Sequence, residues 1–226
     1  MEKQKYKNYL AEVELKIRLA NNAIPHQRAA HKDGFSFSGL PFAEQVLIWD
    51  HIWKHADNYR TQIQAFFFIE NYLGKRELYS AIWNITESWQ EEVSDWSLCD
   101  ALAKIYTKIL ETETKKVYAR LKEWNKDASL WKRRQSLVSL LYYSRTKKIH
   151  LPYLKIITLV KPLLKDKEYY VQKGIGWCLR EVYNVYPEQT YEFLKENIKD
   201  ISSIAFTIAI EKMNEERKDE LKRVRR

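Results

Sequence analysis

The segment 95–110 has an acidic and an aromatic side chain on a different face from its apolar stripe. That stripe has helical spacing and consists of Leu98, Leu102, Ile105 and Ile109. Trp96 and Asp100 are four residues apart, so on a helix they share another face, one turn apart. A carboxylate can accept a proton or stabilise a cation, and an indole face attracts a cation. From its position alone, Asp100 could equally be a surface charge or a partner of the helix dipole.

The segment 168–186 places an indole between two cations. Its buried face is expected to be the apolar stripe of Val171, Ile175, Leu179 and Val182. The opposite edge then presents Trp177 between Lys173 and Arg180. This arrangement favours contact with a nucleic acid. The alternative is a tryptophan that covers a joint between two helices.

Two glycines interrupt the same segment, at Gly174 and Gly176. Each costs about 1 kcal/mol relative to alanine inside a helix. We therefore expect another backbone, or DNA, to approach this helix closely.

Arg134 borders the apolar stripe of the segment 129–147. Trp131 lies three residues before it, and Leu137 and Val138 lie three and four residues after it. A guanidinium at such a border must reach an anion or stack on an aromatic ring to offset its partial burial. We predict an anionic ligand, with a structural salt bridge as the alternative.

The positive charge of the chain is concentrated in one stretch. The formal net charge is +9, and residues 128–165 contain no Asp or Glu. The stretch holds nine cations: Lys132, Arg133, Arg134, Arg145, Lys147, Lys148, Lys155, Lys161 and Lys165. Such a footprint indicates salt-sensitive binding to the phosphates of DNA. The alternative is a set of merely solvated lysines on two helices.

The elements that position these residues are all helical. Glycine and proline number only five each, which argues against a β-sandwich. Helices are expected over 2–23, from Pro41, and near 58–73, 75–88, 95–110, 113–126, 129–147, 151–165, 168–186, 188–197 and 199–215. The stretch 26–40 is expected to be looser, and 214–226 to form a charged tail. Paired helices with short turns predict an all-α helical-repeat solenoid of roughly ten to twelve helices in a single domain. A globular helix bundle is the alternative.

The two cysteines, Cys99 and Cys178, lie in apolar helical patterns. They form neither a disulfide framework nor a zinc pattern, so we expect no metal site and a reducing compartment. The N-terminus has no apolar signal core, and no apolar run approaches the ~20 residues of a membrane span. We expect a soluble, cytoplasmic protein without a membrane partner.

Three segments resemble the AlkD-like family of bacterial DNA alkylation repair glycosylases, which are built from HEAT-like helical repeats. DWSLCD at 95–100 is similar to the family's Trp-Asp-x-Val-Asp segment. WKRR at 131–134 is similar to its Trp-x-x-Arg segment, and VQKGIGWCLRE at 171–181 to its most distinctive signature, Lys-Ala-Ile-Gly-Trp-x-Leu-Arg-Glu. The resemblance covers roughly 41–200.

The resemblance implies a monofunctional glycosylase that excises N3- or N7-alkylated purines from double-stranded DNA while the lesion remains largely in the duplex. It implies catalytic roles for Asp100, Trp96 and Trp177. Asp100 would stabilise an oxocarbenium-like transition state and position water. The expected contacts to the DNA backbone are Arg134, Arg133, Lys132, Lys173, Arg180, Arg145, Lys147 and Lys148. No cofactor is required, and a monomer is expected.

The chain also departs from the family pattern. Ser97 stands where the family often has Asp, and Cys99 where it often has Val. The early Thr-Pro-x-x-Arg type motif is not visible, and LPFAE at 40–44 occupies its region. Two alternatives therefore stay open: a non-catalytic DNA-binding relative, and a helical-repeat scaffold for protein interaction.

Overall fold

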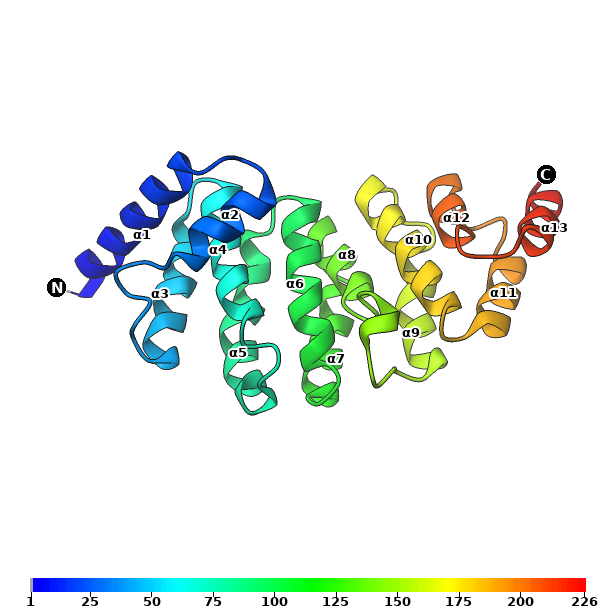
Figure 1. Cartoon of the computed structure of the whole chain (residues 1–226). Helices are drawn as coiled ribbons and strands as arrows, with labels where there is room; N and C mark the ends of the chain where they lie inside the picture. Colours follow the sequence, from blue (N-terminus) through cyan, green and yellow to red (C-terminus); the bar gives the residue numbers. More distant parts are fainter. Residues whose placement is uncertain (1) are drawn as a thin grey trace. The chain divides into compact units, whose positions relative to one another are not determined.

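The computed structural model describes residues 2–226. This part of the chain contains thirteen α-helices and four short 3-10 helices and no strand (Figure 1). The chain divides into two compact units, the first ending at Ser94 and the second running from Asp95 to Arg226. The all-α helical-repeat fold is confirmed, whereas the expected single domain stays a prediction.

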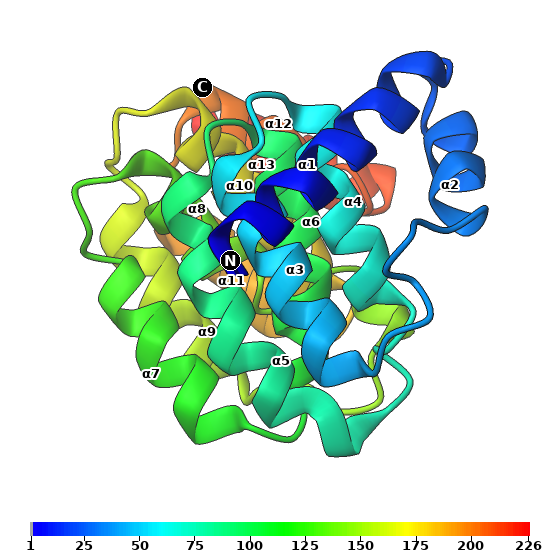
Figure 2. The same ribbon diagram turned by 90° about the vertical axis from the view of Figure 1, so that its left-hand side faces the viewer.

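The first unit is built around a tryptophan-rich core. Its helices are α1 (Glu2–Leu19), α2 (Ile24–Lys32), α3 (Phe42–His55), α4 (Tyr59–Glu70), η1 (Arg76–Leu78), α5 (Tyr79–Thr86) and η2 (Glu87–Glu92). α1 lies against α3 and α4 (Figure 2). The rings of Trp53 and Trp89 stack with centroids 4.6 Å apart, and the Trp53 indole N–H donates to the Trp89 carbonyl at 2.9 Å. This bond satisfies the polar atom that burial of the indole would otherwise leave unpaired.

The second unit contains the remaining helices. They are α6 (Trp96–Ile109), α7 (Thr114–Trp124), α8 (Leu130–Val138), η3 (Ser144–Thr146), α9 (Tyr153–Val160), η4 (Lys161–Leu163), α10 (Tyr169–Tyr183), α11 (Pro187–Glu196), α12 (Ser203–Ala209) and α13 (Glu215–Arg225). In this unit α6 packs on α8, α8 on α10 and α10 on α12 (Figure 1). Every second helix along the chain is therefore a neighbour in space. These four helices form a row, and the row presents the residues singled out in the sequence.

The start of α6 is fixed by its first residues. The Asp95 carboxylate accepts hydrogen bonds from the backbone N–H groups of Ser97 at 2.6 Å and Leu98 at 3.1 Å. An aspartate in this N-cap position satisfies helix donors that have no partner within the helix. Trp96 therefore becomes the first residue of the helix, and Asp100 follows one turn later.

Close approach between α10 and α12 explains Gly176. A Cβ atom at this position would lie 2.6 Å from the Ala205 carbonyl oxygen and 2.8 Å from the Ile208 Cβ. Only glycine permits this spacing of two backbones. The sequence expectation of a close backbone approach is confirmed here, and the neighbour is a helix of the same unit.

Several segments differ from their expected secondary structure, and three of them bear on the candidate site or the chain end. The helix expected over 129–147 ends at Val138, and a turn follows it. The looser stretch 26–40 includes most of α2. The charged tail forms α13 and is anchored, since Leu221 is buried and the Arg225 guanidinium donates to the Ile198 and Ile201 carbonyls.

In residues 2–226, no helix is long and apolar enough to cross a membrane.

Candidate functional site

A cavity of about 280 Å³ opens on the row of helices in the second unit. Its lining consists of Trp96, Asp100, Arg134, Tyr170, Lys173, Trp177, Arg180, Ile208 and Glu211. These residues come from α6, α8, α10, α12 and the turn after α12. The tertiary structure therefore brings together the three sequence segments that stood out by residue type.

An ion pair forms one wall of this cavity. The Arg134 Nη2 donates to Asp100 Oδ1 at 2.7 Å, and its Nη1 donates to the Tyr170 carbonyl at 3.0 Å. The Arg134 side chain is 7% exposed, whereas that of Asp100 is 29% exposed. The guanidinium therefore binds the carboxylate from the buried side, and the Asp100 side chain stays accessible from the cavity.

The surroundings of Asp100 shift the pKa of its carboxyl group in opposite directions. Burial raises the pKa of Asp100 above its ordinary value, while the guanidinium of Arg134 and the ammonium of Lys173 act to lower it. Burial also raises the pKa of the neighbouring Cys99 thiol to about 12. Since the thiolate is the nucleophilic form of cysteine, Cys99 is unsuited to attack. Asp100 is the ionisable group of this wall that can act on a ligand.

Two tryptophans extend the cavity lining. Trp96 is 51% exposed at the start of α6. Trp177 is half-buried, and its ring centroid lies 5.5 Å from that of Tyr142 and 6.0 Å from that of Tyr143. The Arg180 guanidinium lies 5.8 Å from the Trp177 ring centroid, which makes a cation–π contact.

The two cations at the rim, Lys173 and Arg180, differ in whether an acidic residue pairs with them. Lys173 lies 5.4 Å from the Tyr169 ring centroid and, within the described part of the chain, has no ion pair. Arg180 Nη1 donates to Glu211 Oε2 at 2.7 Å. This hydrogen bond lowers the pKa of Glu211, so the rim carries an ionised acid beside Arg180.

Gly174 has a different role from Gly176. A Cβ at Gly174 would lie 3.3 Å from the Arg134 Cγ and 3.5 Å from its Nη1. The missing side chain leaves room for the Arg134 side chain to lie against α10, where its Nη1 meets the Tyr170 carbonyl while its Nη2 meets Asp100 on α6. The close neighbour at this glycine is thus a side chain, and the expectation of a backbone or DNA at Gly174 is wrong.

Arg134 does reach an anion, as the sequence predicted, but that anion is Asp100. The structural salt bridge, the alternative for Arg134, is therefore present. It joins two of the residues that the family resemblance singles out. A contact between Arg134 and a DNA phosphate stays a prediction.

Two residues expected to contact DNA, Lys147 and Arg133, form hydrogen bonds within the fold. The Lys147 side chain is 1% exposed, and its ammonium donates to the carbonyl and hydroxyl oxygens of Thr107. Burial lowers its pKa to about 8. Arg133 donates to the Asp166 carboxylate at 2.6 Å and to the carbonyls of Asp127 and Ala128. Both donors are already engaged within the fold, and their expected contacts with DNA stay predictions.

The acid-free stretch of sequence is not acid-free in space. Acidic residues from outside it pair with Lys132 (Asp127, 3.4 Å), Lys165 (Asp200, 3.2 Å), Arg133 and Arg134. Arg145 and Lys148 are exposed and, among residues 2–226, form no ion pair. The unbalanced charge is therefore smaller than the sequence suggested, and these two residues lie outside the cavity lining.

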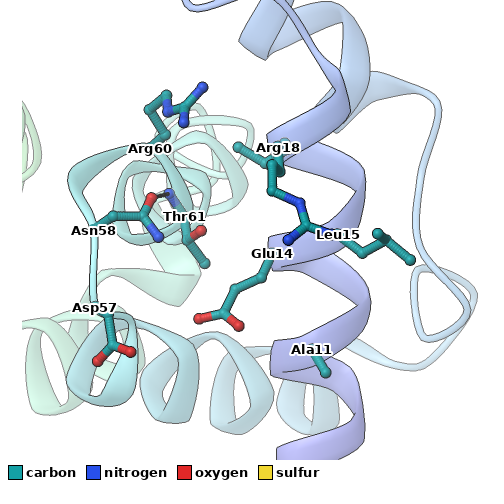
Figure 3. A pocket seen from close by; sticks show the side chains of 9 residues that line it. Ala11, Glu14, Leu15, Arg18, Asp57, Asn58, Arg60 and Thr61 are labelled. Carbon is teal, nitrogen blue, oxygen red and sulfur yellow. Dashed lines mark hydrogen bonds between the residues drawn. The ribbon is translucent and has the colours of Figure 1, made fainter.

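A second hollow, of about 400 Å³, lies in the first unit between α1 and the start of α4 (Figure 3). Glu14 and Arg18 extend into it from α1, and Asp57 and Arg60 lie at its other side. Asn58 caps α4 there by accepting from the Thr61 N–H at 3.0 Å. Two carboxylates balance two guanidiniums and no aromatic ring lines this hollow, so it lacks the features of the first cavity.

Sequence reasoning missed three lining residues: Tyr170, Ile208 and Glu211. Tyr170 contributes its backbone carbonyl, which has no sequence signal. Ile208 and Glu211 belong to a segment expected as one helix over 199–215, and only the packing of α12 on α10 brings them to the cavity.

Within the described chain, no group of three or more His, Cys, Asp or Glu residues is placed to hold a metal ion.

The fold of this chain is similar to solved structures. AlkD2 from Streptococcus mutans superposes with a TM-score of 0.61 at 18% identity, covering 92% of this chain and 99% of that chain. The protein smu.31 from Streptococcus mutans UA159 gives 0.62 at 19% identity, covering 92% and 100%. An Enterococcus faecalis protein described as a predicted DNA alkylation repair enzyme gives 0.66 at 17% identity, covering 85% and 87%. At these identities the similarity concerns the fold.

The sequence itself matches a family model. Curated proteins give no match to this chain. The model of the DNA alkylation repair enzyme family matches residues 4–213, which is nearly the whole chain. The match includes all the residues that line the cavity. This chain therefore belongs to the DNA alkylation repair enzyme family.

Proposed function

We propose that this chain is a DNA glycosylase that excises cationic N3- or N7-alkylated purines from duplex DNA. The proposal is carried by one observation. The partly exposed carboxylate of Asp100 is held by the buried guanidinium of Arg134 in a cavity that Trp96 and Trp177 also line. Membership of the DNA alkylation repair enzyme family supports it.

The substrate chemistry suits a carboxylate. An N3- or N7-alkylated purine carries a positive charge, so the electron pair of the glycosidic bond neutralises the base as it leaves. Positive charge then develops on the deoxyribose in an oxocarbenium-like transition state. Water adds to the anomeric carbon and releases a proton, and the products are the free alkylated base and an abasic site.

Asp100 has the electrostatic role in this scheme. A preorganised carboxylate stabilises positive charge as it develops, and its oxygen can also orient the attacking water. Arg134 fixes the orientation of the carboxylate through the 2.7 Å hydrogen bond to Oδ1, and the Asp100 side chain stays 29% exposed in the cavity lining. Arg134 is therefore a positioning residue in this proposal.

The aromatic and basic residues bind the DNA. Electron-rich faces of Trp96 and Trp177 attract the cationic lesion and sugar. Lys173 and Arg180 at the rim, with Arg145 and Lys148 outside it, provide phosphate contacts that fix the position of the duplex without reading its sequence.

The test is release of N7-methylguanine from a duplex oligonucleotide under single-turnover conditions. Asp100→Asn should lower the rate of base release by at least about 100-fold, because charge stabilisation of a transition state typically contributes that much. Its affinity for the same duplex should stay within about threefold of the wild type. The matched control is Asp200→Asn, which makes the same change at an exposed residue outside the cavity.

The outcomes separate the remaining possibilities. A wild-type protein that binds the duplex but releases no base would be a non-catalytic DNA-binding member of the family. An Asp100→Asn variant as active as the wild type would remove Asp100 from the mechanism while leaving the glycosylase proposal in place.

A further inference from the structure

Tyr143 has an unusual backbone conformation. Its φ of 49° and ψ of 77° lie in the left-handed region, and it is the only non-glycine residue of the described chain with a positive φ. A bulky side chain is rarely found there, because its Cβ crowds the following carbonyl. Such a conformation persists only where its surroundings impose it, and it often marks a functional position.

The next residue imposes this conformation. Ser144 is buried, and all three of its polar groups are bonded. Its N–H and its hydroxyl both donate to Glu181 Oε2, at 2.9 and 2.7 Å, and its carbonyl lies 3.1 Å from His150 Nε2. Asn184 Nδ2 also donates to the Ser144 hydroxyl oxygen at 3.2 Å. The buried Glu181 carboxylate from α10 therefore fixes the turn that begins at Tyr143.

The strained residue presents an aromatic ring to solvent. Tyr143 is 53% exposed, and its ring meets that of Trp177 edge to face, with centroids 6.0 Å apart. Tyr142 packs on both rings. Since Trp177 lines the cavity, the ring of Tyr143 extends an aromatic surface outward from the rim.

The same turn carries exposed positive charge. Arg145 and Lys148 follow Tyr143 and are exposed. An aromatic ring beside cations suits a nucleotide of a duplex, with the ring against the sugar and the cations on the phosphates.

We propose that Tyr143 contacts the nucleotide next to the one in the cavity, and that Glu181 is the positioning residue that holds its ring there. This inference rests on the proposed function, because it assumes that DNA occupies the cavity. It adds a residue that has no charge and does not line the cavity.

The decisive variant is Tyr143→Gly, because glycine accepts the left-handed conformation without strain. It removes the ring and leaves the turn intact. Binding is measured to a duplex with N7-methylguanine and to an undamaged duplex, together with single-turnover base release and Tm. Tyr143→Phe keeps the ring, and Ile149→Ala is the matched control at an exposed apolar residue of the same segment.

We expect Tyr143→Gly to bind both duplexes about fivefold more weakly, because the contact of one aromatic ring with the nucleotide is lost and such a contact contributes about 1 kcal/mol. Its Tm should stay near that of the wild type, because relief of the backbone strain offsets the loss of the ring contacts with Tyr142 and Trp177. Tyr143→Phe and Ile149→Ala should stay within about twofold of the wild type. Binding of Tyr143→Gly within twofold of the wild type would overturn the proposal, and a lowered Tm in that case would assign the ring to packing.

The positioning role of Glu181 is tested by whether the effect of Glu181→Gln on DNA binding requires the Tyr143 ring. Glu181→Gln should weaken binding in the wild-type background and add no further loss in the Tyr143→Gly background. Additive losses would show that Glu181 acts by another route, such as its 3.5 Å ion pair with Arg180, and would overturn its positioning role. Because binding is measured independently of base release, a wild-type protein without glycosylase activity would refute the proposed function and leave this test valid.

Discussion

At the scale of single residues, the pair of Asp100 and Arg134 decides what the cavity can do. A buried guanidinium without a partner would be strongly unfavourable, so Arg134 needs its anion as much as Asp100 needs its cation. The pair satisfies both and leaves the carboxylate partly exposed. A structural ion pair has thereby become the centre of the candidate active site.

This pair predicts an acid limb in the pH dependence of base release. Burial raises the pKa of Asp100 above its ordinary value near 3.8, so the carboxylate takes up a proton at a higher pH than a free aspartate does. Protonation removes the charge that stabilises the transition state, and the rate should therefore fall as the pH falls through that raised pKa. Single-turnover rates from pH 4 to 8, corrected for spontaneous base loss, give the midpoint.

The control is the rate profile of Asp100→Asn, which should be flat over the same range. A wild-type rate that stays constant down to the ordinary pKa of aspartate would contradict the role of an ionised Asp100.

At the scale of elements, α10 positions most of the site. It carries Lys173, Trp177 and Arg180 on one edge, and its two glycines admit other groups closely. Gly174 admits the side chain of Arg134, and Gly176 admits the backbone of α12. The unfavourable helix propensity of both residues is offset by contacts that a larger residue would prevent.

Gly176→Ala should destabilise the protein by about 1–3 kcal/mol, the usual cost of overpacking a well-packed core. The new methyl group would meet a backbone carbonyl, which cannot move without shifting α12. Base release should fall as well, since Ile208 of α12 lines the cavity. The free energy of unfolding, measured by urea denaturation, checks the effect on stability.

Gly74→Ala is the comparison, because no heavy atom lies within 4 Å of a Cβ at that position. Equal stabilities of Gly176→Ala and Gly74→Ala would mean that α10 and α12 are less tightly packed than described.

At the scale of the whole molecule, the net charge of +9 is unevenly balanced. Many of the cations between 128 and 165 have acidic partners from other segments, which leaves Arg145 and Lys148 among those available to a ligand. DNA affinity should therefore depend on a few cations at and beside the cavity.

The salt dependence of DNA binding distinguishes exposed cations from buried ones. Each phosphate contact contributes about 0.9 to the slope of log affinity against log salt concentration. Lys148→Ala should therefore reduce the slope by about that amount. Lys147→Met should leave the slope unchanged, because the Lys147 ammonium is bonded inside the protein. Equal slopes for wild type and Lys148→Ala, or a reduced slope for Lys147→Met, would contradict the assignment.

Local sequence was sufficient for the helices and for the relation between nearby residues. The shared face of Trp96 and Asp100, and of Lys173, Trp177 and Arg180, follows from helical periodicity alone and is found in the structure. The apolar stripes likewise identified the buried faces of α6 and α10.

Extrapolation failed where a helix ended earlier than expected. Periodicity gives the direction of a side chain only while the helix continues, and α8 ends at Val138. Beyond that point the phase is lost, so the burial of Lys147 and the left-handed turn at Tyr143 had no local signal.

Only the tertiary structure decided which charges pair. Asp100 and Arg134 lie on different helices 34 residues apart, and their contact depends on the packing of α6, α8 and α10 and on the space at Gly174. The same holds for the partners of Arg133 and Lys147. The sequence by itself determined the helical fold and the residues able to act on a cation. Packing decided which of them face a ligand, because ion pairing depends on distances between helices that periodicity does not specify.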